Sequence, residues 1–106
     1  MNAVKLIGNV GRNVTVKTFD KLKMATFSLA TNEIYQKKNN EQGTNTTWHN
    51  VVAWGKVADV CEKMISKGKL VVIEGRLNSR TYVNKENKKV NVTEIVALKV
   101  EEAEKN

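Results

Sequence analysis

The stretch from residue 47 to residue 56, Thr-Trp-His-Asn-Val-Val-Ala-Trp-Gly-Lys, constrains this chain more than any other. Its β-branched centre predicts a strand, in which successive side chains point to opposite faces. The small apolar residues Val51 and Ala53 on one face suit a protein core. The other face carries Trp48 and Trp54, roughly 20 Å apart along the strand. Tryptophan is highly buried on average, so this stretch alone leaves open whether the two rings are core residues or a platform for stacking.

The composition is that of a single basic domain. The 106 residues carry a net charge of +7, with a sequence pI near 9.6. Two blocks supply the charge: residues 1–32 hold five Lys/Arg and one acidic residue, and residues 69–92 hold six and two. This charge predicts an anionic polymer as partner, although a well-solvated lysine-rich surface would give the same composition.

Cysteine use and hydropathy favour a reducing compartment. The single cysteine excludes an internal disulfide framework. The sequence has no apolar run of roughly 18 residues, as a membrane helix requires, and its first residues lack the regions of a signal peptide. We therefore expect a cytoplasmic protein.

Alternation of apolar and polar residues predicts five main strands. The first strand bends at Gly8 and Gly11 and continues as a second part that curves away. The last strand is expected to point four side chains inward, those of Val92, Val96, Leu98 and Val100. The predicted strands cover residues 4–10 with 14–19, 24–31, 47–54, 70–77 and 92–100.

The segments between these strands differ in character. Apolar residues at helical spacing, Val57, Val60, Cys61, Met64 and Ile65, predict one helix that ends at Gly68. We interpret Cys61, on the buried stripe, as a packing residue. Residues 33–46 have no apolar period and predict a long mobile hairpin loop, of a kind that is usually functional or disordered. Residues 78–91 predict a second long hairpin, between strands 4 and 5.

The order of these elements predicts the fold class: all-β with one helix. Five strands with a helix between the third and fourth is the order of the OB-fold, a five-stranded Greek-key barrel. In that fold the second and third strands and their loops bind oligonucleotides or oligosaccharides. The tryptophan-bearing strand is third, so its aromatic face is expected to point into the ligand groove.

The sequence argues against catalysis. One histidine and one cysteine cannot form a multi-ligand zinc site, and both are expected to point inward. No Ser-His-Asp grouping or glycine-rich phosphate loop is present. We therefore expect no enzyme activity, no metal site and no cofactor.

What remains is binding to single-stranded nucleic acid, whose bases stack on aromatic rings and whose phosphates attract Lys and Arg. Four of the six aromatic residues lie on three segments that an OB barrel is expected to bring to one side, leaving Phe19 and Phe27. Stacking tolerates every base, so the binding is expected to be sequence-independent. The predicted DNA-binding residues are Tyr35, Lys38, Trp48, Trp54, Lys56, Arg76, Arg80, Tyr82 and Lys85.

Six segments in their order and spacing resemble the bacterial-type single-stranded DNA-binding proteins. They are residues 1–9 (MNAVKLIGN), 27–32 (FSLATN), 47–56 (TWHNVVAWGK), 67–68 (KG), 72–77 (VIEGRL) and 93–96 (TEIV). The resemblance implies that the chain coats single-stranded DNA in replication, recombination and repair, associated with the nucleoid. It places the stacking aromatics at Tyr35, Trp48, Trp54 and Tyr82. It also implies a homotetramer in which first strands pair between protomers, with Lys5, Leu6 and His49 at subunit contacts.

Two departures from the family pattern qualify this expectation. Asn50 stands where a basic residue is common, which puts one backbone contact in doubt. We expect one domain over residues 1–100 and a short acidic tail over residues 101–106. This sequence lacks the long linker and the acidic-hydrophobic tip that are usual in the family. A truncated core, a phage or mobile-element version and an organellar-like short form are all consistent with this.

Three other functions are consistent with parts of the sequence. A primosomal replication-restart adaptor has the same OB dimer but generally lacks the full aromatic set. A cold-shock-like RNA-binding module is expected to cluster its aromatics in short motifs, which this chain does not do. A structural or interaction subunit is expected to bury the tryptophan face against another subunit.

Overall fold

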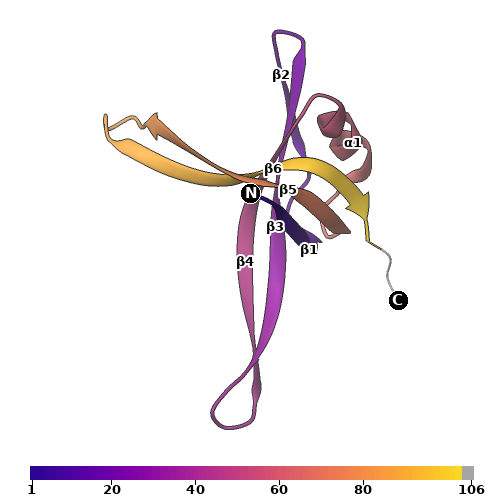
Figure 1. Ribbon diagram of the computed structural model, residues 1–106, viewed down its shortest axis with the longest axis vertical. Helices are drawn as coiled ribbons and strands as arrows, with labels where there is room; N and C mark the ends of the chain where they lie inside the picture. The colour runs from indigo at the N-terminus through magenta and orange to yellow at the C-terminus, as the bar shows by residue number, and fades with distance from the viewer. Residues whose placement is uncertain (104–106) are drawn as a thin grey trace.

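The computed structural model describes residues 1–103 as six strands and one helix (Figure 1). The predicted tail begins inside the last of these strands, which includes Glu101 and Glu102, and residues 104–106 lie outside the described residues. The elements are β1 (Val4–Val10), β2 (Thr15–Phe19), β3 (Leu22–Gln36), β4 (Gln42–Trp54), α1 (Lys56–Met64), β5 (Leu70–Val83) and β6 (Lys89–Glu102).

Five of the strands form a closed barrel, which confirms the predicted OB-fold. They neighbour each other in the order β1-β5-β6-β4-β3, and β1 closes the ring by pairing with β3. All of these pairings are antiparallel except that of β4 with β6, which is parallel. Strand β2 pairs with β3 beyond the point where β1 ends. Strands β1 and β2 therefore lie end to end along β3, in agreement with the predicted first strand in two parts.

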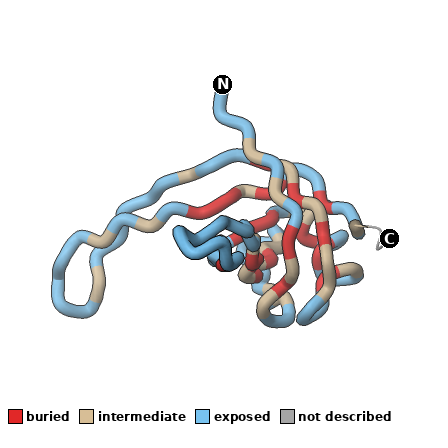
Figure 2. The backbone as a smooth tube through the Cα atoms, turned by 90° about the horizontal axis from the view of Figure 1, so that it is seen from below, coloured by how far each residue is buried: buried red, intermediate tan, exposed pale blue. Residues whose placement is uncertain are grey.

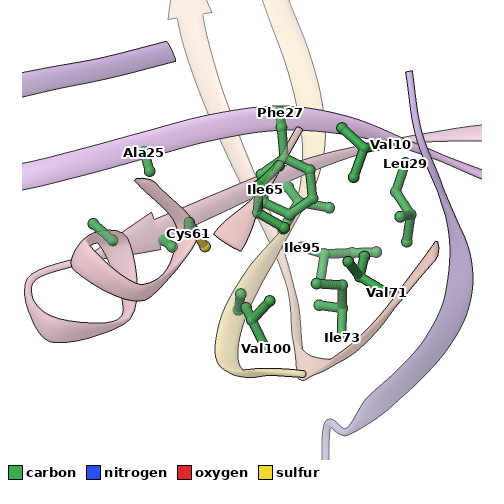
Figure 3. Close-up of a cluster of buried hydrophobic side chains, with 14 residues drawn as sticks. Val10, Ala25, Phe27, Leu29, Cys61, Ile65, Val71, Ile73, Ile95 and Val100 are labelled. Carbon is green, nitrogen blue, oxygen red and sulfur yellow. The ribbon is translucent and has the colours of Figure 1, made fainter. Parts of the chain in front are cut away.

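The core lies inside this barrel, as the labelled side chains of Figure 3 show. Phe27, Leu29 and Ile73 are at most 1% exposed. Val51 and Ala53 of β4 belong to the same buried cluster, as predicted from their small apolar side chains. Because this face of β4 points into the barrel, its tryptophan face points out.

Helix α1 packs against β3, β4 and β6. Its buried side chains are Ala58 and Cys61, followed by Ile65 just after the helix ends. The predicted stripe was wrong at Val60, which is 41% exposed because Ala58 occupies the barrel-facing position. Burial raises the pKa of the Cys61 thiol to about 11, which agrees with its assignment as a packing residue.

The predicted alternation of β6 was wrong at Val92, Val96 and Leu98. Ile95 and Ala97 belong to the buried core, so Val92 and Val96 point to the outer face of the barrel. Leu98 is 62% exposed and does not point inward. Gly75 of β5 pairs with Ala97, whereas the residue before Gly75 pairs with Lys99, so Leu98 is the extra residue of a β-bulge. The bulge shifts the alternation, so Ala97 and Val100 are both buried although they are three positions apart in the sequence. At Gly75 the two strands approach so closely that a Cβ atom would overlap a backbone carbonyl of β6.

Residues 33–46 are not the loop that the sequence predicted. Strands β3 and β4 pair without interruption as far as Gln36 and Gln42, which leaves residues 37–41 as the turn. The paired strands project from the barrel as a long arm (Figure 1), and nearly every residue of it is exposed. In Figure 2 the projecting hairpins are coloured mostly as exposed, whereas the buried residues gather in the barrel. We refer to residues 31–47 as the β3–β4 arm.

The second predicted hairpin is present as a similar projection. Strands β5 and β6 pair through Val83 and Lys89, and residues 84–88 form the turn. In Figure 1 this ribbon leaves the barrel in a different direction from the β3–β4 arm. We refer to residues 79–93 as the β5–β6 arm.

Candidate nucleic-acid interface

The outward face of the β3–β4 ladder carries both tryptophans. Trp54 pairs with Met24 and Trp48 pairs with Ala30, so the two indoles lie on the same face of β4. Trp48 is 61% exposed and Trp54 is 40% exposed. Within this chain, therefore, neither ring is a core residue.

A groove of about 740 Å³ lies next to this face, a volume typical of ligand sites. Trp54 and Asn50 of β4 line one side of it, and residues of β5 and β6 line another. All three arginines of the sequence, Arg12, Arg76 and Arg80, line it as well. Arginine binds phosphate in a planar, bidentate manner and also stacks on flat rings, so the lining suits both parts of a nucleotide chain.

Glu94 is the buried acidic residue of this groove, with 8% of its surface exposed. Its Oε1 atom lies 3.4 Å from Arg80 Nε and accepts a hydrogen bond of 3.3 Å from Asn78 Nδ2. The Arg80 guanidinium carbon also lies 6.0 Å from the ring centroid of Tyr82, in cation–π range. Arg80 is thus positioned by Glu94 and Tyr82, and the other two arginines leave the groove positively charged.

Trp48 lies two residues before the groove residue Asn50 on β4, so both side chains point to the same face of the strand. The β1–β2 connection passes against its ring at Gly11, where a Cβ atom would overlap the indole. Glycine at this position therefore lets the backbone pass the ring while leaving most of the indole exposed.

The other predicted aromatics lie on the two arms. Tyr35 pairs with Gly43 and lies over it, on the ladder face opposite to that of Trp48. It is 43% exposed, and Tyr82 on the β5–β6 arm is 44% exposed. The structure therefore brings Trp48 and Trp54 together on the barrel but places the two tyrosines on separate projections.

The predicted basic residues divide in the same way. Arg76 and Arg80 line the groove. Lys38 and Lys85 lie in the turns at the tips of the two arms, and Lys56 is the exposed first residue of α1. The lysines thus surround the groove at a distance, whereas the arginines form its wall.

The prediction missed one basic residue and one exposed aromatic residue of the groove. Arg12 follows Gly11 in the connection between β1 and β2, and Phe19 ends β2. The Phe19 ring centroid is 6.5 Å from that of Trp54, and the side chain is 50% exposed. The scarcity of arginine among the basic residues was an available signal for Arg12.

The residues predicted at subunit contacts occupy different environments. Lys5 lies on the outer face of β1, with its Nζ 3.7 Å from Glu74 Oε1. Leu6 packs against the core, and the exposed apolar side chain beside it is Ile7, at 58%. His49 is half-buried, with Nε2 2.8 Å from Thr31 Oγ1.

Residues 1–103 contain no group of three or more His, Cys, Asp and Glu side chains placed to hold a metal ion. Helix α1, the helix of this span, has neither the length nor the apolar character to cross a membrane.

Comparison with known proteins identifies similar sequences and structures. The sequence profile of the single-strand binding protein family matches residues 1–102. The "Single-stranded DNA-binding protein 1" of Chlorobaculum tepidum is 40% identical over 98 residues, which are 91% of this chain and 60% of that protein. The "Single-stranded DNA-binding protein" of Neisseria meningitidis is 35% identical over 92% of this chain and 56% of that protein. The chain therefore spans somewhat more than half of the length of these relatives.

Solved structures give the same picture. A structure described as the Plasmodium falciparum SSB complex with ssDNA matches with a TM-score of 0.89 and 32% identity, over 98% of this chain and 96% of that one. A deletion mutant of the single-stranded DNA binding protein from Thermus aquaticus matches with a TM-score of 0.84 and 23% identity, over 98% of this chain and 51% of that one. The second likeness concerns the fold alone.

Proposed function

The chain belongs to the single-strand binding protein family, and we propose that it binds single-stranded DNA without sequence preference. The observation that carries this proposal is the pairing of two exposed tryptophans with an arginine-lined groove on one side of the barrel. Stacking on an aromatic ring contributes roughly 1–3 kcal/mol per base and tolerates every base. The arginines neutralise the phosphates between the stacked bases.

The two arms extend this path. Tyr35 with Lys38 on the β3–β4 arm, and Tyr82 with Lys85 on the β5–β6 arm, each combine an exposed ring with a nearby positive charge. The arms leave the barrel in different directions (Figure 1). A strand that contacts the groove and both arms bends around the barrel, so the complex protects more DNA than the groove alone covers.

The biological role that fits this binding is the coating and protection of single strands during DNA replication, recombination and repair, by a cytoplasmic, nucleoid-associated protein. The family is one of DNA-binding proteins without enzyme activity. The role requires neither a metal nor a cofactor, because stacking and charge neutralisation supply the affinity.

A homotetramer is the assembly that we propose. The outer face of β1 and β5 offers a self-complementary surface, with Ile7 opposite Val72 and the Lys5–Glu74 ion pair beside them. We propose Ile7, and not Leu6, as the apolar residue at the subunit contact. Lys5 and His49 remain proposed subunit-contact residues. Native mass spectrometry tests this assembly: a tetramer is expected, and a stable dimer favours a primosomal adaptor instead.

Tryptophan fluorescence tests the binding itself. Titration with poly-dT at low salt is expected to quench emission, since bases stack on Trp48 and Trp54. The logarithm of the association constant is expected to fall with the logarithm of salt with a slope of about −1.4 or steeper, because the two arginines other than the Glu94-paired Arg80 each contribute about −0.7. Absence of quenching at low salt contradicts the proposal.

Substitutions separate the DNA-binding interpretation from that of a structural subunit. Trp54→Ala is expected to weaken dT binding roughly tenfold or more, the loss of one stacked base, and to leave the assembly intact. Val60→Ala, at an equally exposed apolar position on α1 (41% against 40%), is the matched control and should change neither. If Trp54→Ala instead dissociates the oligomer, the tryptophan face is a subunit contact. Equal affinity for rU and dT oligomers would indicate an RNA-binding module.

A further inference from the structure

Phe19 is the exposed aromatic residue that lies outside the proposed DNA path. It ends β2, is 50% exposed and lines the same groove as Trp54 and Arg12. It is absent from the buried core cluster and from the side chains packed against it. A large apolar side chain that is exposed in a charged groove is more informative than a scattered surface residue, because it adds little to the core.

The register shows how β2 continues the tryptophan face. Met24 of β3 pairs with Trp54 on one side and with Lys17 of β2 on the other. Lys17, Met24 and Trp54 therefore form one row across three strands on the outward face. Phe19 lies two residues after Lys17 on β2, so its side chain points to the same face. The surface on which bases can stack thus extends beyond β4 to the edge strand β2.

The two rings have a geometry that a base can use. Their centroids are 6.5 Å apart and their planes are inclined by 46°, so they form an open wedge. A base held between two parallel rings needs about 7 Å, twice the roughly 3.4 Å spacing of successive nucleotides along a strand. Closing the 46° inclination and moving the centroids about 0.5 Å further apart, to the roughly 7 Å required, makes a parallel two-ring site for one base.

We propose that Phe19 is a further base-contacting residue and forms with Trp54 a two-ring site for one base of the bound strand. The adjacent phosphates are then within reach of Arg12, which lines the groove, and Lys17, which is exposed on β2. This inference rests on the proposed function, because it names a residue of the same single-stranded DNA path.

Phe19 could instead act only through Trp54, by holding the indole in place. Tilted aromatic pairs at this distance stabilise each other, so a substitution of Phe19 that weakens DNA binding does not by itself distinguish the two roles. A double-mutant cycle does. A residue that acts only through Trp54 has no effect once Trp54 is alanine, whereas a residue that contacts the base keeps one.

The variants are Phe19→Leu, Trp54→Ala and the double variant, with Leu22→Ala as matched control. Leu22 pairs directly with Phe19 on the same hairpin and is 48% exposed, and it does not line the groove. Binding is measured by fluorescence anisotropy with a labelled dT oligomer and with an abasic deoxyribose-phosphate polymer of the same length. Thermal unfolding checks that each variant is folded.

Phe19→Leu is expected to weaken binding to dT about five- to tenfold, at the lower end of what one stacked base contributes, and to leave binding to the abasic polymer and the salt slope unchanged. In the Trp54→Ala background it is expected to weaken dT binding at least threefold further. Leu22→Ala is expected to bind like the wild type. Arg12→Gln is expected to make the salt slope shallower by about 0.7 on both polymers.

Three results overturn the inference while leaving the proposed function intact. They are unchanged dT binding by Phe19→Leu, an effect of Phe19→Leu that disappears in the Trp54→Ala background, and an equal loss on the abasic polymer. If the wild-type protein does not bind dT at all, the proposed function fails first, and the two failures are thereby distinguished.

Discussion

The β3–β4 ladder is one continuous ribbon with two contrasting halves. In the barrel half, Phe27, Leu29 and Val51 are at most 1% exposed. In the β3–β4 arm, Ile34 is 72% exposed and Tyr35 is 43% exposed. The backbone pairing runs unbroken through both halves. They differ because β1, β5, β6 and α1 surround the barrel half on one face, whereas the arm projects away from the barrel (Figure 1).

This contrast separates what makes a strand from what makes it stable. Hydrogen-bonded pairing gives extended structure even to the polar residues of the arm, because each backbone group finds a partner across the ladder. Stability comes mainly from apolar burial, at roughly 25 cal/mol per Å². The barrel half therefore fixes the positions of Trp48 and Trp54, and the arm can adjust to a bound strand.

Hydrogen exchange should show the largest difference between the two halves. Amides of the barrel half are expected to exchange only by global unfolding, which costs roughly 5–15 kcal/mol in small domains. Amides of the arm are expected to exchange by local opening at a far smaller cost. Residue-resolved exchange measured by NMR checks this. Equal protection along the whole ladder would show that the arm is as stable as the barrel.

Substitutions within β3 probe the same contrast in side chains. Phe27→Ala is expected to lower the free energy of unfolding by about 3–5 kcal/mol, because it leaves a cavity in the core. Ile34→Ala on the arm is the matched control, expected to cost less than about 0.5 kcal/mol. Urea denaturation measures both. Similar losses for the two variants would contradict the assignment of the core to the barrel half alone.

The barrel half should also respond to alkaline pH through Cys61, whose folded pKa of about 11 exceeds its ordinary value of 9.0. Because the folded state binds the proton more tightly, this stability is fully present below pH 9 and is lost as pH rises toward 11. Over that window the wild type should lose about 1.4 kcal/mol per pH unit relative to Cys61→Ala. Parallel stability curves for the two proteins would contradict the buried thiol.

Gly43→Ala should have a small effect on stability and a selective effect on function. The added Cβ overlaps the ring of Tyr35 and forces it to move, which on an exposed arm should cost less than about 1 kcal/mol of unfolding free energy. Binding to poly-dT should weaken to the level of Tyr35→Ala. Wild-type affinity in Gly43→Ala would mean that the position of Tyr35 over Gly43 does not matter for binding.

Much of the site could be predicted from local pattern. The alternation around Val51 and Ala53 predicted which face of β4 is buried, and the OB-fold order of the elements predicted that Trp48 and Trp54 point into the groove. Family membership is shown by matches that cover nearly the whole chain. The arm was missed because its residues lack an apolar period, and ladder pairing does not require one.

Other features depend on contacts between residues far apart in the sequence. Arg12 and Phe19 reach the groove because the pairing of β3 with β4 places the β2–β3 hairpin beside Trp54, and no local pattern encodes that pairing. Val100 points inward, as Ala97 does, because the close approach of β5 and β6 at Gly75 places a bulge at Leu98. In each case one residue of offset reverses the face that a side chain occupies.

The sequence by itself determined the order of strands and helix, the buried face of the central strand and the basic, aromatic character of the chain. These are local properties, since alternation and charge are read along a single strand. Only the tertiary structure decided which residues share the groove, because closure of the barrel brings together side chains from β2, β4, β5 and β6 that are up to 77 positions apart. It also decided that the tyrosines lie on separate arms, since the length of a ladder depends on its pairing and not on its apolar pattern.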